Sequence, residues 1–180
     1  MNMLVSAAEI QTKVSELAEK IQANEPNDTL FVALLNGAAP FAVDLMRALA
    51  SKPDVYPTLR YMHTSTYGEG FKAGEVAIVS DTIGKTALGG RTIMVLDDVL
   101  DTGKTYAAVR EDLIARGAAQ DCIKLAVLAQ KDVPRQDDIR ADYVAFDLPN
   151  QWLYGGGLNG IPGADNPEAG RWLSAIYTAD

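Results

Sequence analysis

The chain has 180 residues, 48% of them hydrophobic, which is enough for one globular domain with a buried core. Its net charge of −8 argues against nonspecific nucleic-acid binding, which needs a basic surface, but is compatible with a local positive site for a small anion. No apolar run approaches the roughly 20 residues of a membrane span, and the single cysteine, Cys122, excludes an internal disulfide and fits a reducing cytoplasm.

The first 50 residues predict a helix, a strand and a second helix. Ser6 and Glu9 form a capping box, and apolar residues then recur at helical spacing, so we expect a helix over residues 6–23. The apolar stretch 29–35 predicts a short strand. A turn of small residues follows it, and Pro40 is typical of the start of a helix, which we expect to run to about residue 49.

The next segment predicts a β-hairpin. Residues 58–67 and 76–79 have strand character, and the stretch between them is rich in glycine. That stretch, 68–74, loosely imitates a dinucleotide-binding fingerprint, but no helix follows it. We therefore interpret it as a mobile loop, and the residues leave open whether it is a plain surface loop or a functional lid.

The most informative stretch begins with an apolar run at residues 92–96, which predicts a strand buried on both faces. Two carboxylates, Asp97 and Asp98, follow at its end, and Asp101 comes three residues later. The segment 102–105, Thr-Gly-Lys-Thr, then begins a helix. Backbone N–H groups at such a loop and the positive end of the helix favour a phosphate group. The neighbouring carboxylates could hold sugar hydroxyls or a metal ion on the same ligand.

Two other interpretations of this stretch are weaker. An ATP-binding P-loop needs a glycine five residues before Gly103, and that position is Asp98. An ordinary buried strand with a solvated acidic turn gives no reason for three like charges to crowd beside one glycine loop.

The second half of the chain predicts further alternation of helices and strands. We expect a helix over 104–116 that ends at Gly117, and strands at 122–128 and 143–148. After Pro149 regular patterning is lost. Strands that alternate with helices predict an α/β fold with a parallel sheet covered on both faces, in which loops at the carboxyl ends of the strands converge on one crevice.

The motif of strand, paired acids and Asp-Thr-Gly-Lys-Thr closely resembles the signature of the phosphoribosyltransferases. Four further stretches resemble the hypoxanthine-guanine phosphoribosyltransferases: residues 32–45, 65–68, Lys131 with Pro134 and Arg135, and 142–155. The resemblance covers about residues 30–158. It implies the type I fold as a single domain over residues 1–180, with a core at about 25–148, a small hood at about 149–180, a lid, and the N-terminal helix packed against the core.

The resemblance also implies an activity. A 6-oxopurine, which is hypoxanthine, guanine or xanthine, would react with phosphoribosyl pyrophosphate to give a purine nucleoside monophosphate and pyrophosphate, with Mg²⁺ neutralising the leaving group. The site residues it implies are Asp101 as the catalytic base; Asp97, Asp98, Thr102, Gly103, Lys104, Thr105, Asn36 and Gly37 for phosphoribosyl pyrophosphate; Ser65 and Tyr67 in the lid; Lys131, Trp152 and Leu153 for the purine; and Asp97, Asp98 and Asn159 for the metal.

Two of these assignments have ordinary alternatives. Lys131 would donate to the purine 6-oxo group, but most lysines are simply solvated at the surface. Trp152 would stack on the base, but a tryptophan in the core or at an interface is nearly as common.

The chain departs from the family pattern at three substituted positions and at a fourth where the family arginine is missing. Asp97 stands where the family often has glutamate, Asn36 where it often has lysine, and Asn159 where it usually has aspartate. The family also has an arginine shortly after that aspartate, for which Arg171 is the candidate here. These changes bear on pyrophosphate affinity and purine choice rather than on the fold.

Two alternative functions stay open. The chain could be a regulator that kept the fold and lost turnover, or a phosphoribosyltransferase for another base, such as a pyrimidine. Asp101 and Lys131 favour an enzyme, and Lys131 together with Trp152 favours a purine. The resemblance implies a homodimer or homotetramer, without nucleic-acid or membrane partners.

Overall fold

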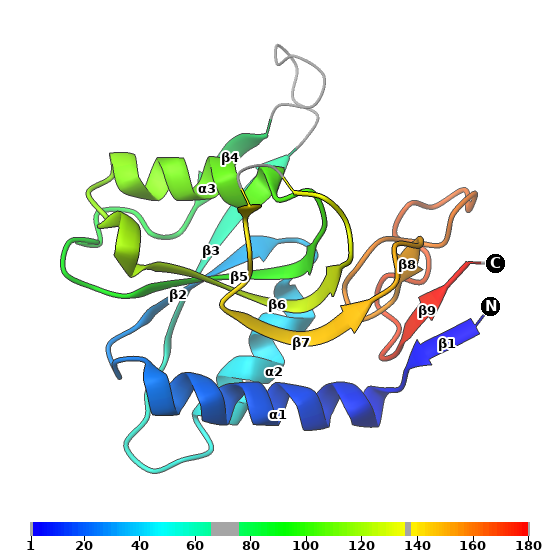
Figure 1. The fold of residues 1–180 in the computed structure, drawn as a ribbon, viewed down its shortest axis with the longest axis horizontal. Coiled ribbons are helices and arrows are strands. Elements are labelled where there is room, and N and C mark those ends of the chain that lie inside the picture. The colour runs from blue at the N-terminus through cyan, green and yellow to red at the C-terminus, as the bar shows by residue number, and fades with distance from the viewer. Residues whose placement is uncertain (1, 66–75, 136–137, 180) are drawn as a thin grey trace.

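The computed structural model describes residues 2–65, 76–135 and 138–179. A six-stranded sheet in the order β4-β3-β2-β5-β6-β7 forms the centre of these residues (Figure 1). Its strands are β2 (Leu30–Leu35), β3 (Thr58–Ser65), β4 (Ala77–Asp81), β5 (Ile93–Leu100), β6 (Ile123–Lys131) and β7 (Tyr143–Leu148). Only β4 among them is antiparallel to its neighbour, so the expected parallel sheet is confirmed.

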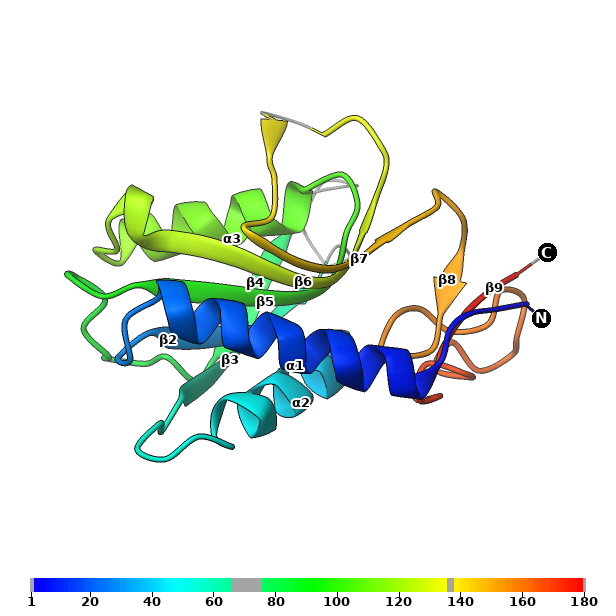
Figure 2. The ribbon, with the colours of Figure 1, turned by 60° about the horizontal axis from the view of Figure 1, so that its bottom comes forward.

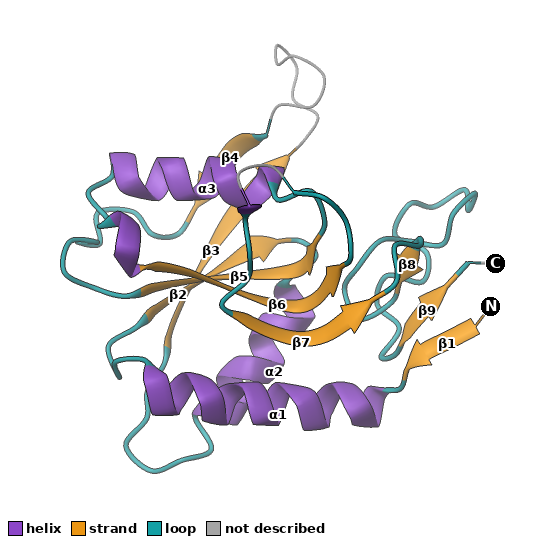
Figure 3. Cartoon of the chain, in the orientation of Figure 1, coloured by secondary structure: helices purple, strands orange, loops and turns teal. Residues whose placement is uncertain are grey.

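Three helices cover the two faces of this sheet. α1 (Ala7–Asn24) and α2 (Ala39–Leu49) lie on one face and α3 (Lys104–Ala115) on the other (Figures 2 and 3). The capping box that begins α1 is present, because Ser6 and Glu9 each accept a backbone hydrogen bond from the other. Pro40 lies in the first turn of α2, as the sequence predicts.

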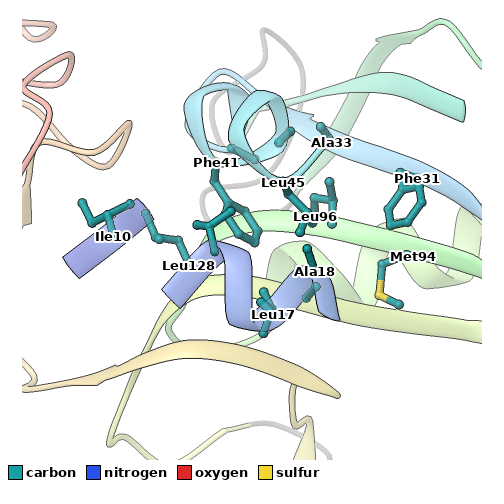
Figure 4. Close-up of a cluster of buried hydrophobic side chains, with 14 of the residues drawn as sticks. Ile10, Leu17, Ala18, Phe31, Ala33, Phe41, Leu45, Met94, Leu96 and Leu128 are labelled. Carbon is teal, nitrogen blue, oxygen red and sulfur yellow. The ribbon is translucent and has the colours of Figure 1, made fainter. Parts of the chain in front are cut away.

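Successive side chains of the buried strands point to opposite faces of the sheet, so they form two separate hydrophobic cores. Phe31 of β2 and Met94 and Leu96 of β5 face α1 and α2, where they pack with Phe41 and Leu45 (Figure 4). The intervening residues of the same strands face α3: they include Leu30, Val32, Ile93 and Val95. Both faces are therefore apolar, which is why these strands have nearly continuous hydrophobic sequences.

A second sheet lies beyond the carboxyl ends of the parallel strands (Figure 1). It is antiparallel in the order β1-β9-β8, with β1 (Asn2–Val5), β9 (Ile176–Thr178) and β8 (Leu153–Tyr154). No sequence pattern predicts this sheet, since strands of 2–4 residues are too short to show a period. The stacked rings of Tyr154 and Tyr177, 5.5 Å apart, fasten β8 to β9.

Several element boundaries differ from the prediction, and β6 runs to Lys131 where we expected the strand to end at residue 128. β5 continues to Leu100, so Asp97 and Asp98 lie inside the strand and not after its end. Cys122 belongs to a short 3₁₀ turn, η1 (Gln120–Cys122), instead of the strand that follows. The glycine-rich stretch 68–74 and Tyr67 lie outside the described residues. No helix in the described part of the chain is both long and apolar enough to cross a membrane.

Candidate active site

Three adjacent strands end beside one another at the carboxyl edge of the main sheet. Asn36 and Gly37 follow β2, Asp101 follows β5, and Lys131 is the last residue of β6. Because β5 pairs with both β2 and β6, the loops that follow these strands meet at one place. The convergence expected from a parallel sheet is therefore present for these three segments.

The turn after β2 comes unusually close to the acidic strand. A Cβ atom placed on Gly37 would lie 2.6 Å from both Cγ and Oδ2 of Asp98. That is far inside van der Waals contact, so a side chain at position 37 would displace the carboxylate. A third segment joins them, because a Cβ atom on Gly157 would lie 2.3 Å from the Gly37 carbonyl oxygen. Without a Cβ atom, Gly37 leaves room for the Asp98 carboxylate and Gly157 leaves room for the Gly37 backbone.

The carboxylates of Asp97 and Asp98 are neighbours in β5, and both residues are partly buried. The Asp98 N–H donates to Oδ1 of Asp97 at 3.0 Å. Burial, followed by the charge of Asp98, raises the pKa of Asp97 well above its ordinary value. Burial also raises the pKa of Asp98, which hydrogen bonds and the positive charge of Arg171 partly offset. An added cation or hydrogen-bond donor would therefore stabilise the ionised form of the pair.

This pair suits a hard divalent cation whose other ligands come from a substrate. Mg²⁺ in phosphate enzymes is commonly held by one or two carboxylates together with phosphate oxygens and water. Within residues 2–65, 76–135 and 138–179, no cluster of three or more His, Cys, Asp or Glu side chains has the geometry of a metal site. Asn159 uses its side-chain amide to donate to the Leu153 carbonyl oxygen at 3.2 Å. The two carboxylates therefore fit a Mg²⁺ ion that takes its remaining ligands from a substrate and water.

The segment after Asp101 forms a glycine turn at the start of α3, where the sequence predicts an anion loop. Gly103 is the N-cap of α3 with φ of +83°, a conformation that favours glycine, and it has no side chain with which to cap the helix. The first N–H groups of α3 are therefore available to a ligand. Residues 102–105 line one cavity together with Asp97 and Asp101. A Cβ atom on Gly103 would press against Ile139, 3.2 Å away.

Lys131 and Asp101 form an ion pair across the ends of β5 and β6. The Lys131 Nζ atom donates to Oδ2 of Asp101 at 3.1 Å. The Lys131 side chain is only 11% exposed, whereas that of Asp101 is 46% exposed. This rules out a freely solvated surface lysine. The Asp101 carboxylate is exposed enough to contact a ligand.

Trp152, which we expect to stack on the purine base, lies next to β8 in the three-stranded sheet. Trp152 is 50% exposed, which excludes a core tryptophan, and its indole N–H donates to the Gly160 carbonyl oxygen at 2.9 Å. Leu153, the next residue, is fully buried in β8. Ser65 is the last residue of β3, and its lid partner Tyr67 lies outside the described residues.

Two arginines contribute more to this region than sequence reasoning assigned to them. Arg135 donates to the backbone oxygens of Asp101 and Lys131. Arg171 pairs with Glu168 at 2.8 Å, donates to the Gly157 carbonyl oxygen at 3.5 Å, and lowers the pKa of Asp98 by its charge. Arg171 is a candidate because the arginine of the family pattern is missing from its usual position. No local sequence pattern predicts the contacts of Arg135.

A parallel α/β sheet with an acidic central strand end and a glycine-hydroxyl loop that begins a helix defines a type I phosphoribosyltransferase fold. Comparison with known proteins agrees, because the family described as phosphoribosyl transferase domain matches residues 2–156. The hypoxanthine-guanine phosphoribosyltransferase of Bacillus subtilis is 36% identical over 179 residues, covering 97% of this chain and 94% of that protein. The chain belongs to the hypoxanthine-guanine phosphoribosyltransferase family, whose members are glycosyltransferases of purine salvage.

Two further comparisons define the extent of the likeness. The bifunctional protein TilS/HprT of Listeria innocua is 35% identical over 159 residues, and the matched region spans 23% of that longer protein. The hypoxanthine phosphoribosyltransferase of Trypanosoma cruzi, solved in a ternary substrates complex, superposes with a TM-score of 0.81 at 26% identity, covering 100% of this chain and 95% of that one. The family and fold class predicted from the sequence are thus confirmed.

Proposed function

We propose that this protein transfers a phosphoribosyl group from phosphoribosyl pyrophosphate to a 6-oxopurine in purine salvage. N9 of hypoxanthine, guanine or xanthine forms a bond to the sugar C1 atom, and the bond from C1 to pyrophosphate breaks. The base loses a proton from N7 to Asp101, and pyrophosphate leaves with the bonding electron pair. The products are a purine nucleoside monophosphate and pyrophosphate.

The observation that carries this proposal is the contact between Lys131 and Asp101. It sets a hydrogen-bond donor and an acceptor 3.1 Å apart. The neighbouring O6 and N7–H groups of a 6-oxopurine are an acceptor and a donor, so they complement this pair. Adenine has an amino group at C6, which cannot accept a hydrogen bond from Lys131.

The carboxylates of Asp97 and Asp98 are proposed to hold the ribose hydroxyls, directly or through Mg²⁺. The raised pKa values of the pair support this role, since a cation or a hydroxyl donor would stabilise the ionised form. When bound, Mg²⁺ neutralises the pyrophosphate that departs. Asn159 is the weakest member of the proposed metal set, because its amide already donates to Leu153.

The phosphate groups are assigned to two loops. Thr102, Gly103, Lys104 and Thr105 would bind the 5′-phosphate through N–H groups, hydroxyls and the start of α3, a role supported by the uncapped helix. Asn36 and Gly37 would bind the pyrophosphate. Asn36 brings no charge, so Arg171 is the proposed cation for the leaving group, a role supported by its charge beside Asp98.

The remaining assignments concern the base and the lid. Trp152 would stack on the purine, supported by its half-exposed ring. Leu153 would contact the base through its backbone. Ser65 and Tyr67 would close over the pyrophosphate and exclude water, which competes for the activated sugar.

The proposal extends to the setting of the enzyme. We expect a homodimer or homotetramer in the cytoplasm, with the chain divided into a core at about 25–148 and a hood at about 149–180. A single cysteine suits a reducing compartment, and the family resemblance supports an oligomer. Light scattering coupled to gel filtration measures the oligomeric state directly.

An assay of the purified protein tests the activity. Each of hypoxanthine, guanine, xanthine, adenine and uracil is incubated with phosphoribosyl pyrophosphate and Mg²⁺, and nucleotide formation is followed by chromatography. Product from the 6-oxopurines alone supports the proposal. Product from uracil would indicate a transferase for another base. Tight binding of phosphoribosyl pyrophosphate without product from any base would indicate a regulator.

A further inference from the structure

The guanidinium group of Arg135 joins the two strand ends that carry Asp101 and Lys131. Its Nε atom donates to the Asp101 backbone oxygen at 3.0 Å, and its Nη2 atom donates to the Lys131 backbone oxygen. Both acceptors are main-chain atoms of the two residues whose side chains form the ion pair. One arginine thus holds both residues through their backbones, leaving their side chains to face a ligand.

These contacts occur where the backbone pairing of β5 with β6 stops. The register between the strands runs to Leu100 opposite Gln130, and Asp101 and Lys131 are the next residues along each chain. Ladder hydrogen bonds fix the separation of paired strands. Beyond the last pair this constraint is lost, and Arg135 supplies a cross-link at the level of the two proposed functional residues.

Arginine is suited to this role by its shape. The guanidinium group is planar and carries its donors in a fixed fork, so two acceptors bound to it keep a constant separation. The Lys131 carbonyl also accepts from the Val133 N–H at 3.1 Å, which closes the turn from Lys131 toward Arg135. A lysine at position 135 would have a flexible stem and a single ammonium group, and would not fix both carbonyls in this way.

We propose that Arg135 is a positioning residue that sets the separation of Asp101 and Lys131, and thereby the match of this pair to the O6 and N7 atoms of a 6-oxopurine. The inference rests on the proposed function and adds the residue that makes the base site rigid. Displacement of a catalytic group by about 1 Å can cost about 10²-fold in rate, so the effect of losing this cross-link is measurable. Arg135 acts through its two neighbours and not on the substrate.

The variants R135A and R135K test this, with R140A as the matched control. Arg140 is an exposed arginine five residues further along the chain, so its removal changes the net charge equally. We expect R135A to lose about 10²-fold in kcat/KM for hypoxanthine, with the KM for phosphoribosyl pyrophosphate unchanged. R135K should keep the melting temperature of the wild type and recover only part of the activity. Added guanidinium ion at millimolar concentration should raise the activity of R135A and leave that of R140A unchanged.

Three readouts contradict the inference. The first is R135A activity equal to that of R140A. The second is a loss of affinity for phosphoribosyl pyrophosphate in R135A that is as large as its loss of kcat/KM for hypoxanthine. That result indicates a general structural role or direct contact with phosphoribosyl pyrophosphate. The third is a crystal structure of R135A, or of R135K if R135A does not fold, in which Lys131 and Asp101 keep their contact. Wild-type protein without activity toward any purine would end the proposed function, whereas the crystal structure would still decide the role of Arg135.

Discussion

The Nζ atom of Lys131 lies 3.1 Å from the Oδ2 atom of Asp101, a residue 30 positions earlier in the chain. The two side chains meet because β5 and β6 are parallel neighbours whose matched ends carry them. Lys131 is mostly buried, so the interaction is screened less than at an open surface. A purine edge that enters this site would find a donor and an acceptor already side by side, which limits the reorganisation needed during reaction.

The D101N variant tests the role of Asp101 as the base. Asparagine has nearly the same shape as aspartate but cannot take the purine proton at neutral pH. We expect kcat to fall by about 10²–10⁴-fold, the usual contribution of a general base, while binding of phosphoribosyl pyrophosphate is little changed. Steady-state kinetics with each substrate varied in turn measures both quantities. Equal losses in kcat and in sugar-phosphate affinity would contradict a base role.

The K131M variant tests purine selection. Methionine keeps an unbranched, flexible stem and removes the ammonium group. The preference for hypoxanthine over adenine in kcat/KM should fall by about 10- to 100-fold, the cost of one hydrogen bond from a charged donor. Competition between the two bases for limiting phosphoribosyl pyrophosphate gives the ratio. An unchanged preference would remove Lys131 from the base site, even if overall activity dropped.

Local and strongly periodic features of the fold could be predicted from the sequence. The capping box of Ser6, Pro40 in the first turn of α2, and the strand at 143–148 all depend on residues close together in the chain. The small sheet could not be predicted, because Asn2 pairs with Thr178 and the strands have no room for a period. Its formation depends on tertiary contacts between the two ends of the chain.

At the candidate site, too, local sequence features could be predicted and contacts between distant segments could not. The residue types of the central motif predicted a phosphate loop beside paired acids, and in the structure residues 102–105 line one cavity with Asp97 and Asp101. The ion pair of Lys131 with Asp101 and the double contact of Arg135 depend on how two strands end relative to each other. That geometry is set by strand pairing and has no local signature in the sequence.

A pH-dependent contribution to stability is expected from Asp81. The hydrogen bond from Arg116, at 2.7 Å, holds the pKa of Asp81 below its ordinary value in the folded state. This stabilisation is therefore complete above the unfolded pKa of about 4 and is lost as the pH falls below it. The D81N variant should be less stable than the wild type by about 1 kcal/mol at pH 7, and the difference should shrink under acid. Urea unfolding at several pH values measures it.

Asparagine at position 81 keeps an oxygen that can accept from the N–H groups of Ile83 and Gly84, so the comparison isolates the charge. D121N is a suitable control, because Asp121 is exposed in η1. A difference between D81N and wild type that stays constant from pH 7 down to pH 3 would mean that the ion pair is not its source.

Gly37 and Gly89 offer a matched pair of substitutions, because neither has a positive φ that alanine would strain. In G37A the new methyl group would lie 2.6 Å from the Asp98 carboxylate, whereas in G89A the nearest atom is 3.7 Å away. Displacement of Asp98 should lower kcat/KM for phosphoribosyl pyrophosphate by about 10²-fold in G37A, with G89A close to wild type. Calorimetric titration of both variants with that substrate and Mg²⁺ separates weakened binding from slowed chemistry. Wild-type affinity and rate in G37A would show that the turn after β2 can move away from Asp98 without consequence, and the pyrophosphate site would then have to be sought elsewhere along the sheet edge.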